Sequence, residues 1–421
     1  MDLEVTSVLW KQHVEDRPVT ADDFQLANSI IDPQQMADSD ILVELLYLSV
    51  DPYMRGMMRD AQVGSTPCAW GVVVVVGYYR QPFEPGQLLS SRGIARVKKA
   101  GPGVGSGFEE GDVLSGMLPW SSHAVLGRRG QGRAQAQLQL VDSRLLGRVP
   151  LPCFLGALGM PGLTAWAGLR RIAQPVAGQL LKGVHGCTVI GSAGSDEKMR
   201  IGFRVGGAGL TGQQLKCVYS CTVINSAGNH DQGVFEDNGV LLVQFKAGDS
   251  VAVWSNVAML KQHGFDAAFN YKTSSTAEAL QQAAPDGIDI YFDNVGGPTL
   301  DAALEAARPH ARVVACGAIS QYDLPQEQRY GVKNLLSVIT KRIKLQGFVV
   351  GDYAAEIARD FHEDMSQHVL TGTVKALQHV THGLENAGAA FVGMMGGGNI
   401  GKAVVQVVQQ DPHPVVQQQQ Q

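Results

Sequence analysis

The sequence predicts an α/β fold with two parts, a β-rich domain followed by a doubly wound parallel sheet. First, 421 residues exceed what one hydrophobic core usually organises, so two domains are expected. Second, short apolar runs at 41–50, 72–76 and 93–97 are broken by Gly, Pro and Asp, as in a small barrel or sandwich. Third, strand-like and helical runs alternate after residue 159, which indicates parallel strands joined by crossover helices.

The element order after residue 159 follows from periodicity and from Gly, Pro and Asp breaks. The helix expected at 162–173 precedes strands at 187–191, 221–225, 239–245, 250–254, 288–293 and 312–316, with helices at 257–263, 276–284 and 299–307. A long helix at 353–370 and a strand at 402–408 follow, and we expect this strand to return to the first domain. Residues 127–139 read as a solvated loop, and the Gln-rich tail 409–421 is expected to be disordered.

Composition excludes several classes of function. The net charge is −5 and no long basic run occurs, which disfavours nucleic-acid binding. No apolar stretch approaches the ~20 residues of a membrane span. The first residues lack the cationic and apolar segments of a signal peptide. We therefore expect a cytoplasmic protein with no nucleic-acid or membrane partner.

The six cysteines predict no metal site. They stand at 68, 153, 187, 217, 221 and 316, without Cys-x-x-Cys spacing or neighbouring histidines. Cys217 and Cys221 are four residues apart but have no second pair. Reduced, buried thiols are the expected state.

One short phrase occurs twice. Cys-Thr-Val-Ile-Gly-Ser-Ala-Gly-Ser fills 187–195, and Cys-Thr-Val-Ile-Asn-Ser-Ala-Gly-Asn fills 221–229. Each copy suggests a buried strand and the loop that meets an adenosine ribose in a dinucleotide-binding unit. Two copies indicate either an unusual insertion or a damaged cofactor site.

Between the copies lies a G-x-G-x-x-G pattern, formed by Gly207, Gly209 and Gly212. These glycines could cradle a pyrophosphate if a helix begins at Thr211, because backbone N–H groups and the helix dipole attract phosphate. Only eight residues separate Gly212 from Cys221, which is short for a crossover helix. A plain glycine turn is the alternative.

Six phrases in order carry a family resemblance. They occupy 48–56, 156–165, 264–272, 291–297, 316–322 and 396–402. Together they resemble the zinc-independent medium-chain reductases, in the NADP-dependent alkenal and prostaglandin reductase branch. The resemblance implies a GroES-like substrate domain at 1–160 and 350–408 and a Rossmann-type cofactor domain at 161–349, irregular at 178–263. It also implies NADPH as cofactor, an α,β-unsaturated ketone or aldehyde as substrate, and a possible homodimer.

The resemblance assigns the catalytic role to Tyr322. This residue follows the strand that ends near Cys316, at the sheet edge where ligands bind in doubly wound folds. Its phenol could hydrogen-bond a carbonyl or an enolate during hydride addition. The alternative is a tyrosine that only caps a loop.

A cation after the second strand suits the 2′-phosphate of NADP, and Lys198 holds that place in the first copy of the repeat. The second copy offers Asn229 and His230 instead. If the second copy faced the cofactor, the assignment of NADP would weaken.

The remaining expected contacts fall into two sets. Cofactor contacts are expected from Tyr271, Asn294, Cys316, Gly317, Ala318, Ile319, Ser320, Phe348, Val349, Val350 and Asn399. Substrate walls are expected from Tyr53, Trp120 and Tyr353, with Phe348 contributing to both sets. Asp51 and Arg55 are close enough in sequence to suggest a local ion pair.

The expected activity is NADPH-dependent reduction of the carbon–carbon double bond of an enone or enal. A zinc alcohol dehydrogenase would need Cys and His ligands that no spacing here supplies. A quinone reductase of the same superfamily remains open, as does a non-catalytic relative whose cofactor site is disrupted.

Overall fold

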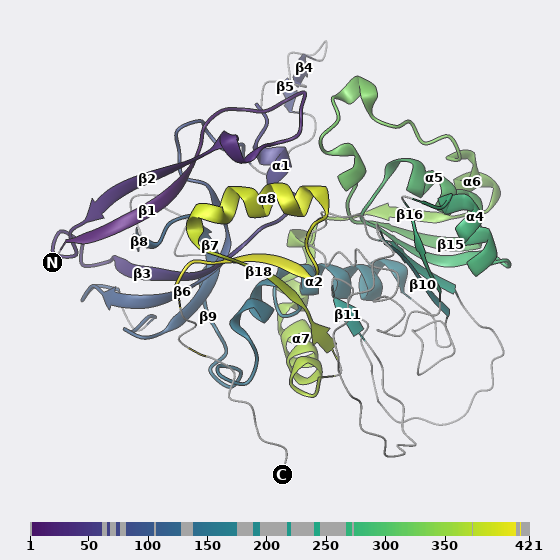
Figure 1. Ribbon diagram of the computed structural model, residues 1–421. Helices are drawn as coiled ribbons and strands as arrows, with labels where there is room; N and C mark the ends of the chain where they lie inside the picture. The colour runs from purple at the N-terminus through teal and green to yellow at the C-terminus, as the bar shows by residue number, and fades with distance from the viewer. Residues whose placement is uncertain are drawn as a thin grey trace.

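The computed structural model describes most of the chain outside the repeat region. It covers residues 2–60, 65–67, 73–75, 81–104, 107–127, 138–174, 188–193, 217–219, 240–244, 267–271, 273–372, 374–409 and 413. Figure 1 shows two bodies side by side, one formed mainly by the first strands of the chain and the other by the strands and helices after residue 188. The α/β fold class predicted from the sequence is confirmed.

The first body is rich in antiparallel β-structure. Its main sheet has the order β18-β19-β3-β6-β7-β9, with β8 also paired to β3. The strands are β3 (Ile41–Ser49), β6 (Ser90–Ala100), β7 (Val113–Pro119), β8 (His123–Leu126), β9 (Gln139–Leu140), β18 (Gln378–His382) and β19 (Lys402–Gln406). Strand β19 pairs antiparallel with β3, so the end of the chain joins a sheet built from its beginning.

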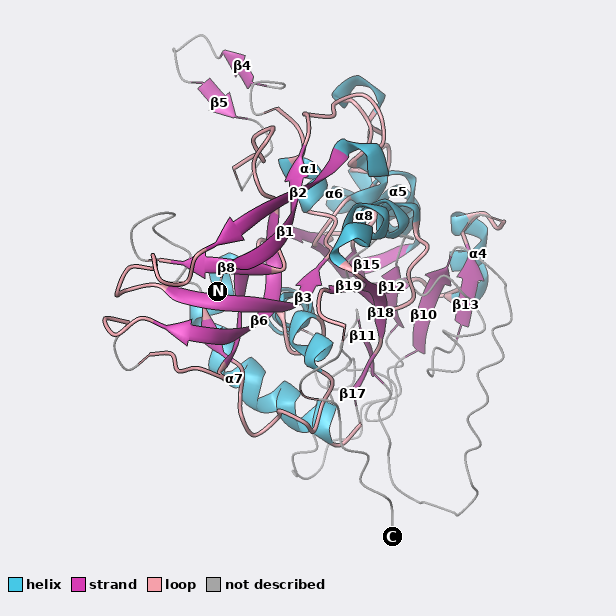
Figure 2. Cartoon of the chain, turned by 60° about the vertical axis from the view of Figure 1, so that its left-hand side comes forward, coloured by secondary structure: helices cyan, strands magenta, loops and turns pink. Residues whose placement is uncertain are grey.

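Aliphatic strand faces supply the core of this body. Nearly every residue of β3 is buried, because its apolar side chains face packing partners on both sides of the sheet. A hairpin of β1 (Leu3–Trp10) and β2 (Phe24–Ile31), which the sequence did not indicate, covers this core together with α8 (Ala387–Gly396). Figure 2 shows the hairpin and α8 on the same side of the body. The small elements are α1 (Met54–Met57), β4 (Ser65–Pro67) and β5 (Val73–Val75).

The second body is built on a six-stranded parallel sheet with the order β13-β10-β12-β14-β15-β16. Its strands are β10 (Thr188–Ala193), β12 (Val240–Gln244), β13 (Ala267–Asn270), β14 (Ile288–Asp293), β15 (Ala307–Ala315) and β16 (Lys344–Gly347). A dinucleotide-binding sheet has the order 3-2-1-4-5-6, with its ligand crevice where the order reverses. Here the order reverses between β12 and β14, which we call the switch point of the sheet. The sheet continues from this pair through β10 and β13 on one side and through β15 and β16 on the other.

The strands fill these positions in an unusual chain order. Strand β10 takes the second position, yet it precedes the central strand β12 in sequence. The first copy of the repeated phrase therefore supplies the strand beside the centre, where the ribose-binding strand belongs. The second copy at 221–229 lies outside the described residues, as do the predicted strand at 250–254 and helix at 257–263. Strand β11 (Cys217–Tyr219), which lies between β10 and β12 in the sequence, pairs with β17 (Val374–Ala376).

Most predicted elements outside that region are confirmed. The strand predicted at 288–293 is β14, and the long helix predicted at 353–370 is α7 (Gly351–Leu370). The helix predicted at 162–173 is α2 (Met160–Ala167) continued by the π-helical turn η4 (Gly168–Ala173). The remaining α-helices are α4 (Thr276–Ala283), α5 (Gly297–Ala306) and α6 (Leu336–Thr340). Residues 128–137 of the predicted loop and most of the tail lie outside the described part.

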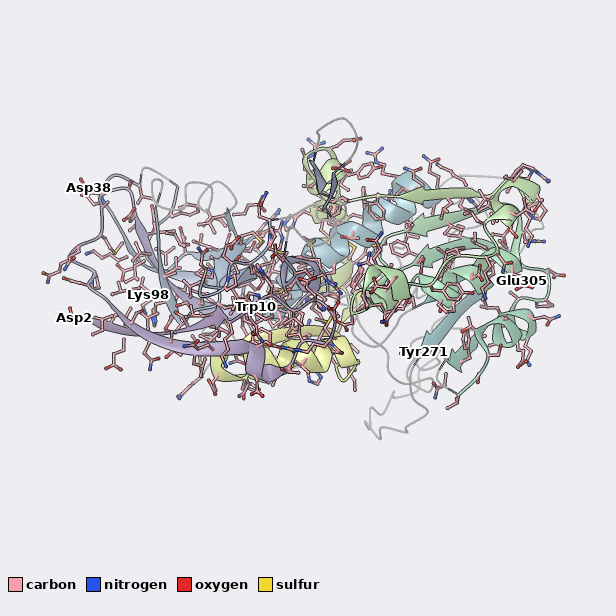
Figure 3. The ribbon with its side chains drawn as sticks, turned by 90° about the horizontal axis from the view of Figure 1, so that it is seen from above. Asp2, Trp10, Asp38, Lys98, Tyr271 and Glu305 are labelled. Carbon is pink, nitrogen blue, oxygen red and sulfur yellow. The ribbon has the colours of Figure 1, made fainter. Side chains whose placement is uncertain are left out.

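Helices α2 and α7 lie where the two bodies meet (Figure 1). Trp166 of α2 packs edge-on against Phe361 of α7, with ring centroids 6.4 Å apart. Their hydrophobic cluster includes Val404 of the antiparallel sheet and both Phe292 and Val314 of the parallel sheet. One continuous core therefore joins the two bodies. Seen from above, Trp10 marks the first body and Glu305 the second (Figure 3).

Candidate active site

The turn after β14 is fixed by a buried aspartate. The Asp293 carboxylate accepts hydrogen bonds from the backbone N–H groups of Val295 and Gly296, both at 2.9 Å, and from the Tyr291 hydroxyl at 2.7 Å. Burial raises the pKa of Asp293, and these three donors oppose that rise. The turn therefore holds Asn294, the next residue, at the carboxyl end of the strand beside the switch point.

This turn packs directly on the loop after β15. Gly296 has a φ of +66°, a conformation that suits glycine, and a Cβ there would lie 2.8 Å from the Cβ of Ala318. The Ser320 hydroxyl donates to the Val295 carbonyl at 2.6 Å. The N–H of Ile319 donates to the Asn294 carbonyl at 3.1 Å. The two loops therefore form one hydrogen-bonded unit at the sheet edge.

Tyr322 ends the short 3-10 helix η5 (Ile319–Gln321) in this unit. Its phenol oxygen accepts a hydrogen bond from the Ala318 N–H at 3.1 Å. A Cβ at Gly317 would stand 3.2 Å from the same oxygen, so the loop approaches the phenol closely. The sequence allowed either loop capping or a catalytic role for this tyrosine. In the contact with Ala318, the phenol oxygen acts as the hydrogen-bond acceptor.

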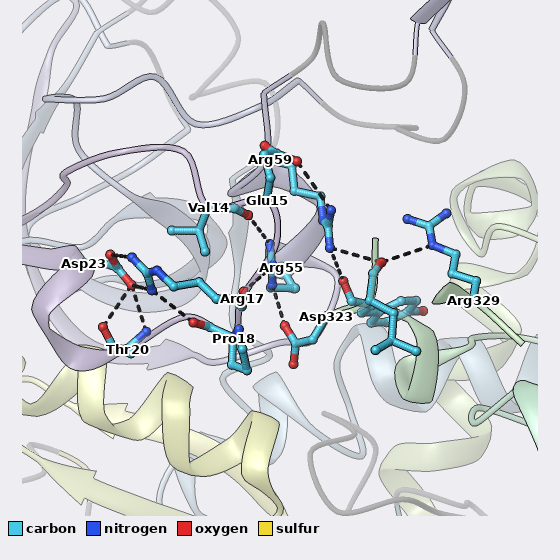
Figure 4. Close-up of polar contacts among 12 residues, drawn as sticks. Val14, Glu15, Arg17, Pro18, Thr20, Asp23, Arg55, Arg59, Asp323 and Arg329 are labelled. Carbon is cyan, nitrogen blue, oxygen red and sulfur yellow. Dashed lines mark hydrogen bonds and ion pairs between the residues drawn. The ribbon is translucent and has the colours of Figure 1, made fainter. Parts of the chain in front are cut away.

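Two arginines of the first body hold the residues around Tyr322 (Figure 4). Arg59 Nη2 donates to the Tyr322 carbonyl at 2.9 Å. Arg55 Nε donates to Asp323 Oδ1 at 2.6 Å, and the Arg55 side chain is fully buried. Burial lowers the pKa of Arg55, and the Asp323 carboxylate opposes this effect. We refer to these Arg55 and Arg59 contacts with residues 322 and 323 as the interdomain latch.

The ion pair suggested between Asp51 and Arg55 is wrong. Arg55 pairs with Asp323 instead, and its two terminal nitrogens donate to backbone carbonyls of the N-terminal segment at 2.9 and 3.0 Å. Asp51 pairs with Lys402 of β19 at 3.1 Å. Both partners come from distant parts of the chain, which spacing within the local sequence could not indicate.

A cavity of about 780 Å³ opens between the bodies at this edge. Its lining combines the sheet-edge loops, the segment before α7, one face of α7, and part of the antiparallel sheet. Asn294 lines it and is 4% exposed, and no described residue accepts a hydrogen bond from its Nδ2 group. A buried amide without a partner is costly, so this group suits a polar ligand. The position fits the ribose or nicotinamide side of a dinucleotide bound at the switch point.

Many of the residues predicted for the site meet at this cavity. Those that line it are Tyr53, Asn294, Cys316, Gly317, Tyr322, Phe348, Val349 and Val350. Ala318, Ile319 and Ser320 form the turn that supports Tyr322. Whether each contacts cofactor or substrate stays a prediction, but the sheet-edge residues are placed together.

Other predicted residues lie elsewhere. Trp120 is fully buried in the core of the first body and donates to the Ser91 hydroxyl at 2.8 Å, so it does not line this cavity. Tyr353 packs edge-on against Phe348, with ring centroids 6.2 Å apart, and is not among the residues that line the cavity. The Asn399 side chain donates to the Gly401 carbonyl at 2.8 Å.

Tyr271 directly follows β13, at the outer part of the parallel sheet (Figure 3), and does not line the cavity. Lys198, Gly207, Gly209 and Gly212 lie outside the described residues. The repeat region therefore contributes the described strands β10 and β11, but no described site residue.

The sequence missed one side of the cavity. Arg92 of β6, Ser115 of β7 and Gln139 of β9 line it from the antiparallel sheet. Nothing in the local sequence marks these residues, because strand pairing brings them together. Helix α7 adds Ala354 and His362, which stand eight residues apart on the cavity face. That spacing of two helical turns was a usable signal, since it repeats the period of one helix face.

Comparisons with known proteins agree with this architecture. Residues 7–78 match the model of the "N-terminal domain of oxidoreductase" family, and 251–369 match that of the "Zinc-binding dehydrogenase" family. A 2-alkenal reductase (NADP(+)-dependent) of Nicotiana tabacum is 34% identical over 95% of this chain and 96% of the relative. Prostaglandin reductase 1 of Bos taurus is 32% identical over 94% and 97%. The structure of CurA from Vibrio vulnificus in complex with NADPH aligns with a TM-score of 0.68 and 25% identity, covering 96% and 100%.

The chain therefore belongs to the zinc-independent medium-chain dehydrogenase/reductase family, in the NADP-dependent alkenal and prostaglandin reductase branch. The resemblance in the six ordered phrases is confirmed. In the part of the chain that the structure describes, no three His, Cys, Asp or Glu side chains group as metal ligands. No helix among the described residues is both long and apolar enough to cross a membrane.

Proposed function

We propose that this protein reduces the carbon–carbon double bond of α,β-unsaturated ketones or aldehydes with NADPH. The observation that carries the proposal is that Tyr322 and Asn294 line one cavity at the switch point, where the Nδ2 group of Asn294 has no hydrogen-bond acceptor among the described residues. The NADP-dependent names of the relatives and the NADPH complex of the structural neighbour support the same cofactor.

NADPH, when bound, supplies the hydride for the β-carbon of the substrate. The protein then has to stabilise the negative charge that develops on the carbonyl oxygen. Tyr322 is placed to donate its hydroxyl proton in a hydrogen bond to that oxygen. Because the Ala318 N–H donates to the phenol oxygen, it polarises the O–H group and strengthens it as a donor.

The interdomain latch and the apolar walls of the cavity position Tyr322 and the substrate for this step. Arg59 holds the Tyr322 carbonyl and Arg55 holds Asp323, so a movement of the loop would break these part-buried contacts. Phe154, Leu158 and Phe348 give the cavity apolar walls that exclude water from the reacting carbons. Either solvent or Tyr322 supplies the proton for the α-carbon.

The cofactor contacts of the repeat region belong to the same proposal. Strand β10 stands in the second position of the sheet, and Lys198 follows its last residue, Ala193, by five positions. We assign Lys198 to the 2′-phosphate and the glycines of 207–212 to the pyrophosphate. The domain division at residues 160 and 350, a homodimer and a cytoplasmic location complete the proposal.

The test is a titration with NADPH followed by turnover. We expect binding at micromolar concentration, with NADH at least tenfold weaker because it lacks the 2′-phosphate. NADPH oxidation in the presence of an enone should produce one saturated carbonyl product per cofactor consumed. No binding up to millimolar NADPH would instead support a non-catalytic relative, and consumption with quinones alone would support a quinone reductase.

A further inference from the structure

The loop that carries Tyr322 is attached to both bodies. It comprises residues 320–334 and includes the short 3-10 helix η6 (Gln326–Gln328). The interdomain latch holds the first part of this loop against the first body, through residues 322 and 323. The second part returns to helix α5 of the parallel-sheet body, where a buried carboxylate receives it.

Asp301 is that carboxylate. It lies on α5, one helical turn after Gly297, and is 7% exposed. Its Oδ1 accepts hydrogen bonds from the backbone N–H groups of Lys333 and Asn334, at 2.9 and 2.7 Å. Its Oδ2 accepts a hydrogen bond from the Tyr330 hydroxyl at 2.8 Å. Because hydrogen bonds to an ionised acceptor are stronger than neutral ones, these three contacts fix the end of the loop firmly on α5.

Further hydrogen bonds connect this attachment to Tyr322. The backbone N–H of Tyr330 donates to Gln321 Oε1 at 2.7 Å, and Gln321 Nε2 donates to the Ser320 hydroxyl at 2.7 Å. That hydroxyl donates in turn to the Val295 carbonyl at 2.6 Å. Gln321 directly precedes Tyr322, so a continuous series of contacts joins α5 to the backbone that carries the tyrosine.

We call the hydrogen bonds of Asp301 and Gln321 with this loop the α5 brace. The brace and the turn that holds Asn294 share one support, because α5 begins at Gly297, three residues after Asn294. A group fixed to α5 keeps its distance from this turn even if the two bodies shift relative to each other. The interdomain latch alone would instead carry Tyr322 along with the first body.

Resting on the proposed reductase function, we propose that Asp301 is a positioning residue, which holds Tyr322 in register with the bound cofactor through the α5 brace. Asp301 does not line the cavity, so it acts through the loop. Misplacement of a reacting group by about 1 Å can cost up to ~10²-fold in rate. Loss of the brace therefore lowers kcat while leaving the binding of cofactor and substrate nearly unchanged.

Steady-state kinetics of enone reduction test this role. Asp301→Ala removes the three acceptor contacts and should lower kcat about tenfold, with KM for the enone and Kd for NADPH within about twofold. Asp301→Asn keeps an acceptor for the two backbone N–H groups and should restore most of kcat. Glu305→Ala is the matched control, because it removes an exposed carboxylate one turn further along α5 and should leave kcat unchanged.

A second variant breaks the brace without disturbing the buried carboxylate. Gln321→Leu removes the acceptor of the Tyr330 N–H, so it tests the proposal even if Asp301→Ala does not fold. It should also lower kcat, and the double variant should fall no further than the more impaired single variant, because both changes break one series of contacts. Fully additive effects on kcat would overturn the proposal. Thermal unfolding of each variant checks that it is folded.

Hydrogen exchange measured by peptide mass spectrometry separates this proposal from the proposed reduction. We expect the amides of Tyr322 and Tyr330 to exchange faster in Asp301→Ala than in the unchanged protein, and at the original rate in Glu305→Ala. Faster exchange supports the positioning of Tyr322 even in a protein that reduces no enone. Unchanged exchange at Tyr322 overturns the proposal, as does faster exchange with full kcat, which would make Asp301 a structural residue only.

Discussion

Removing the carboxylate of Asp323 should impair catalysis without impairing cofactor binding. Asp323 follows Tyr322 directly and meets the fully buried Arg55 at 2.6 Å, so Asp323→Ala leaves a buried cation without its counter-charge. Breaking a fully buried pair costs about 3–5 kcal/mol. Because the Asp323 side chain is 31% exposed, water screens part of this interaction and about 2 kcal/mol is the better figure.

The catalytic effect follows from displacement of the tyrosine. A shift of about 1 Å in a reacting group can cost up to ~10²-fold in rate, and the latch is what fixes residues 322 and 323 against the first body. We therefore expect kcat for enone reduction to fall between tenfold and a hundredfold. The Kd for NADPH should stay within twofold, because Asp323 does not line the cavity. Steady-state kinetics and a fluorescence titration measure the two quantities.

Two variants control this experiment. Asp323→Asn keeps an acceptor for Arg55 Nε but loses the charge, so its kcat should lie between those of the alanine variant and the unchanged protein. Glu327→Ala removes an exposed carboxylate from the same loop and should change nothing. If Asp323→Ala lowered the thermal midpoint but retained full kcat, the latch would stabilise the fold without positioning Tyr322.

Three further predictions concern other parts of the structure. Gly317→Ala places a Cβ 3.2 Å from the hydroxyl oxygen of Tyr322 and should lower kcat about tenfold. The control Gly331→Ala, whose Cβ meets no atom within 4 Å, should leave kcat unchanged. Equal kinetics for the two variants would contradict the close approach of the loop to Tyr322. Asp23 accepts hydrogen bonds from a neighbouring guanidinium that hold its pKa below the usual range, so its stabilisation is present above pH ~4 and lost as the pH falls. Asp23→Asn should therefore flatten the acid side of a plot of thermal midpoint against pH, and an unchanged slope would refute the assignment. Burial raises the pKa of Cys153 to about 12, so iodoacetamide should leave it unmodified in the native protein at neutral pH and alkylate it after unfolding, as peptide mass spectrometry can check.

The sequence predicted those elements whose signal is local. The run Ile288–Asp293 is apolar and bounded by turn residues, and it forms β14 over the predicted range. The helix predicted at 353–370 begins two residues earlier as α7, because its apolar residues keep the helical period. The grouping of Asn294, Gly317 and Tyr322 was also predicted, since residues that follow parallel strands share one sheet edge.

The sequence could not predict contacts that depend on tertiary pairing. Arg55 stands four residues after Asp51, which suggested a local pair, but its partner Asp323 is 268 residues away. Arg92 of β6 and Ala354 of α7 line one cavity although they are far apart in the sequence. The chain order within the parallel sheet was also hidden, because the strand at 239–245 was recognised without any sign that it is central.

The role of Tyr322 as hydrogen-bond donor to the substrate carbonyl is the central claim, and single-turnover reduction by Tyr322→Phe tests it most directly. The protein is saturated with NADPH, mixed with an enone, and followed by the loss of reduced-nicotinamide absorbance. Removing one such donor costs about 10²–10³-fold in comparable oxyanion sites, so we predict a fall of at least a hundredfold with unchanged affinity for NADPH. A rate constant equal to that of the unchanged protein would contradict the assignment.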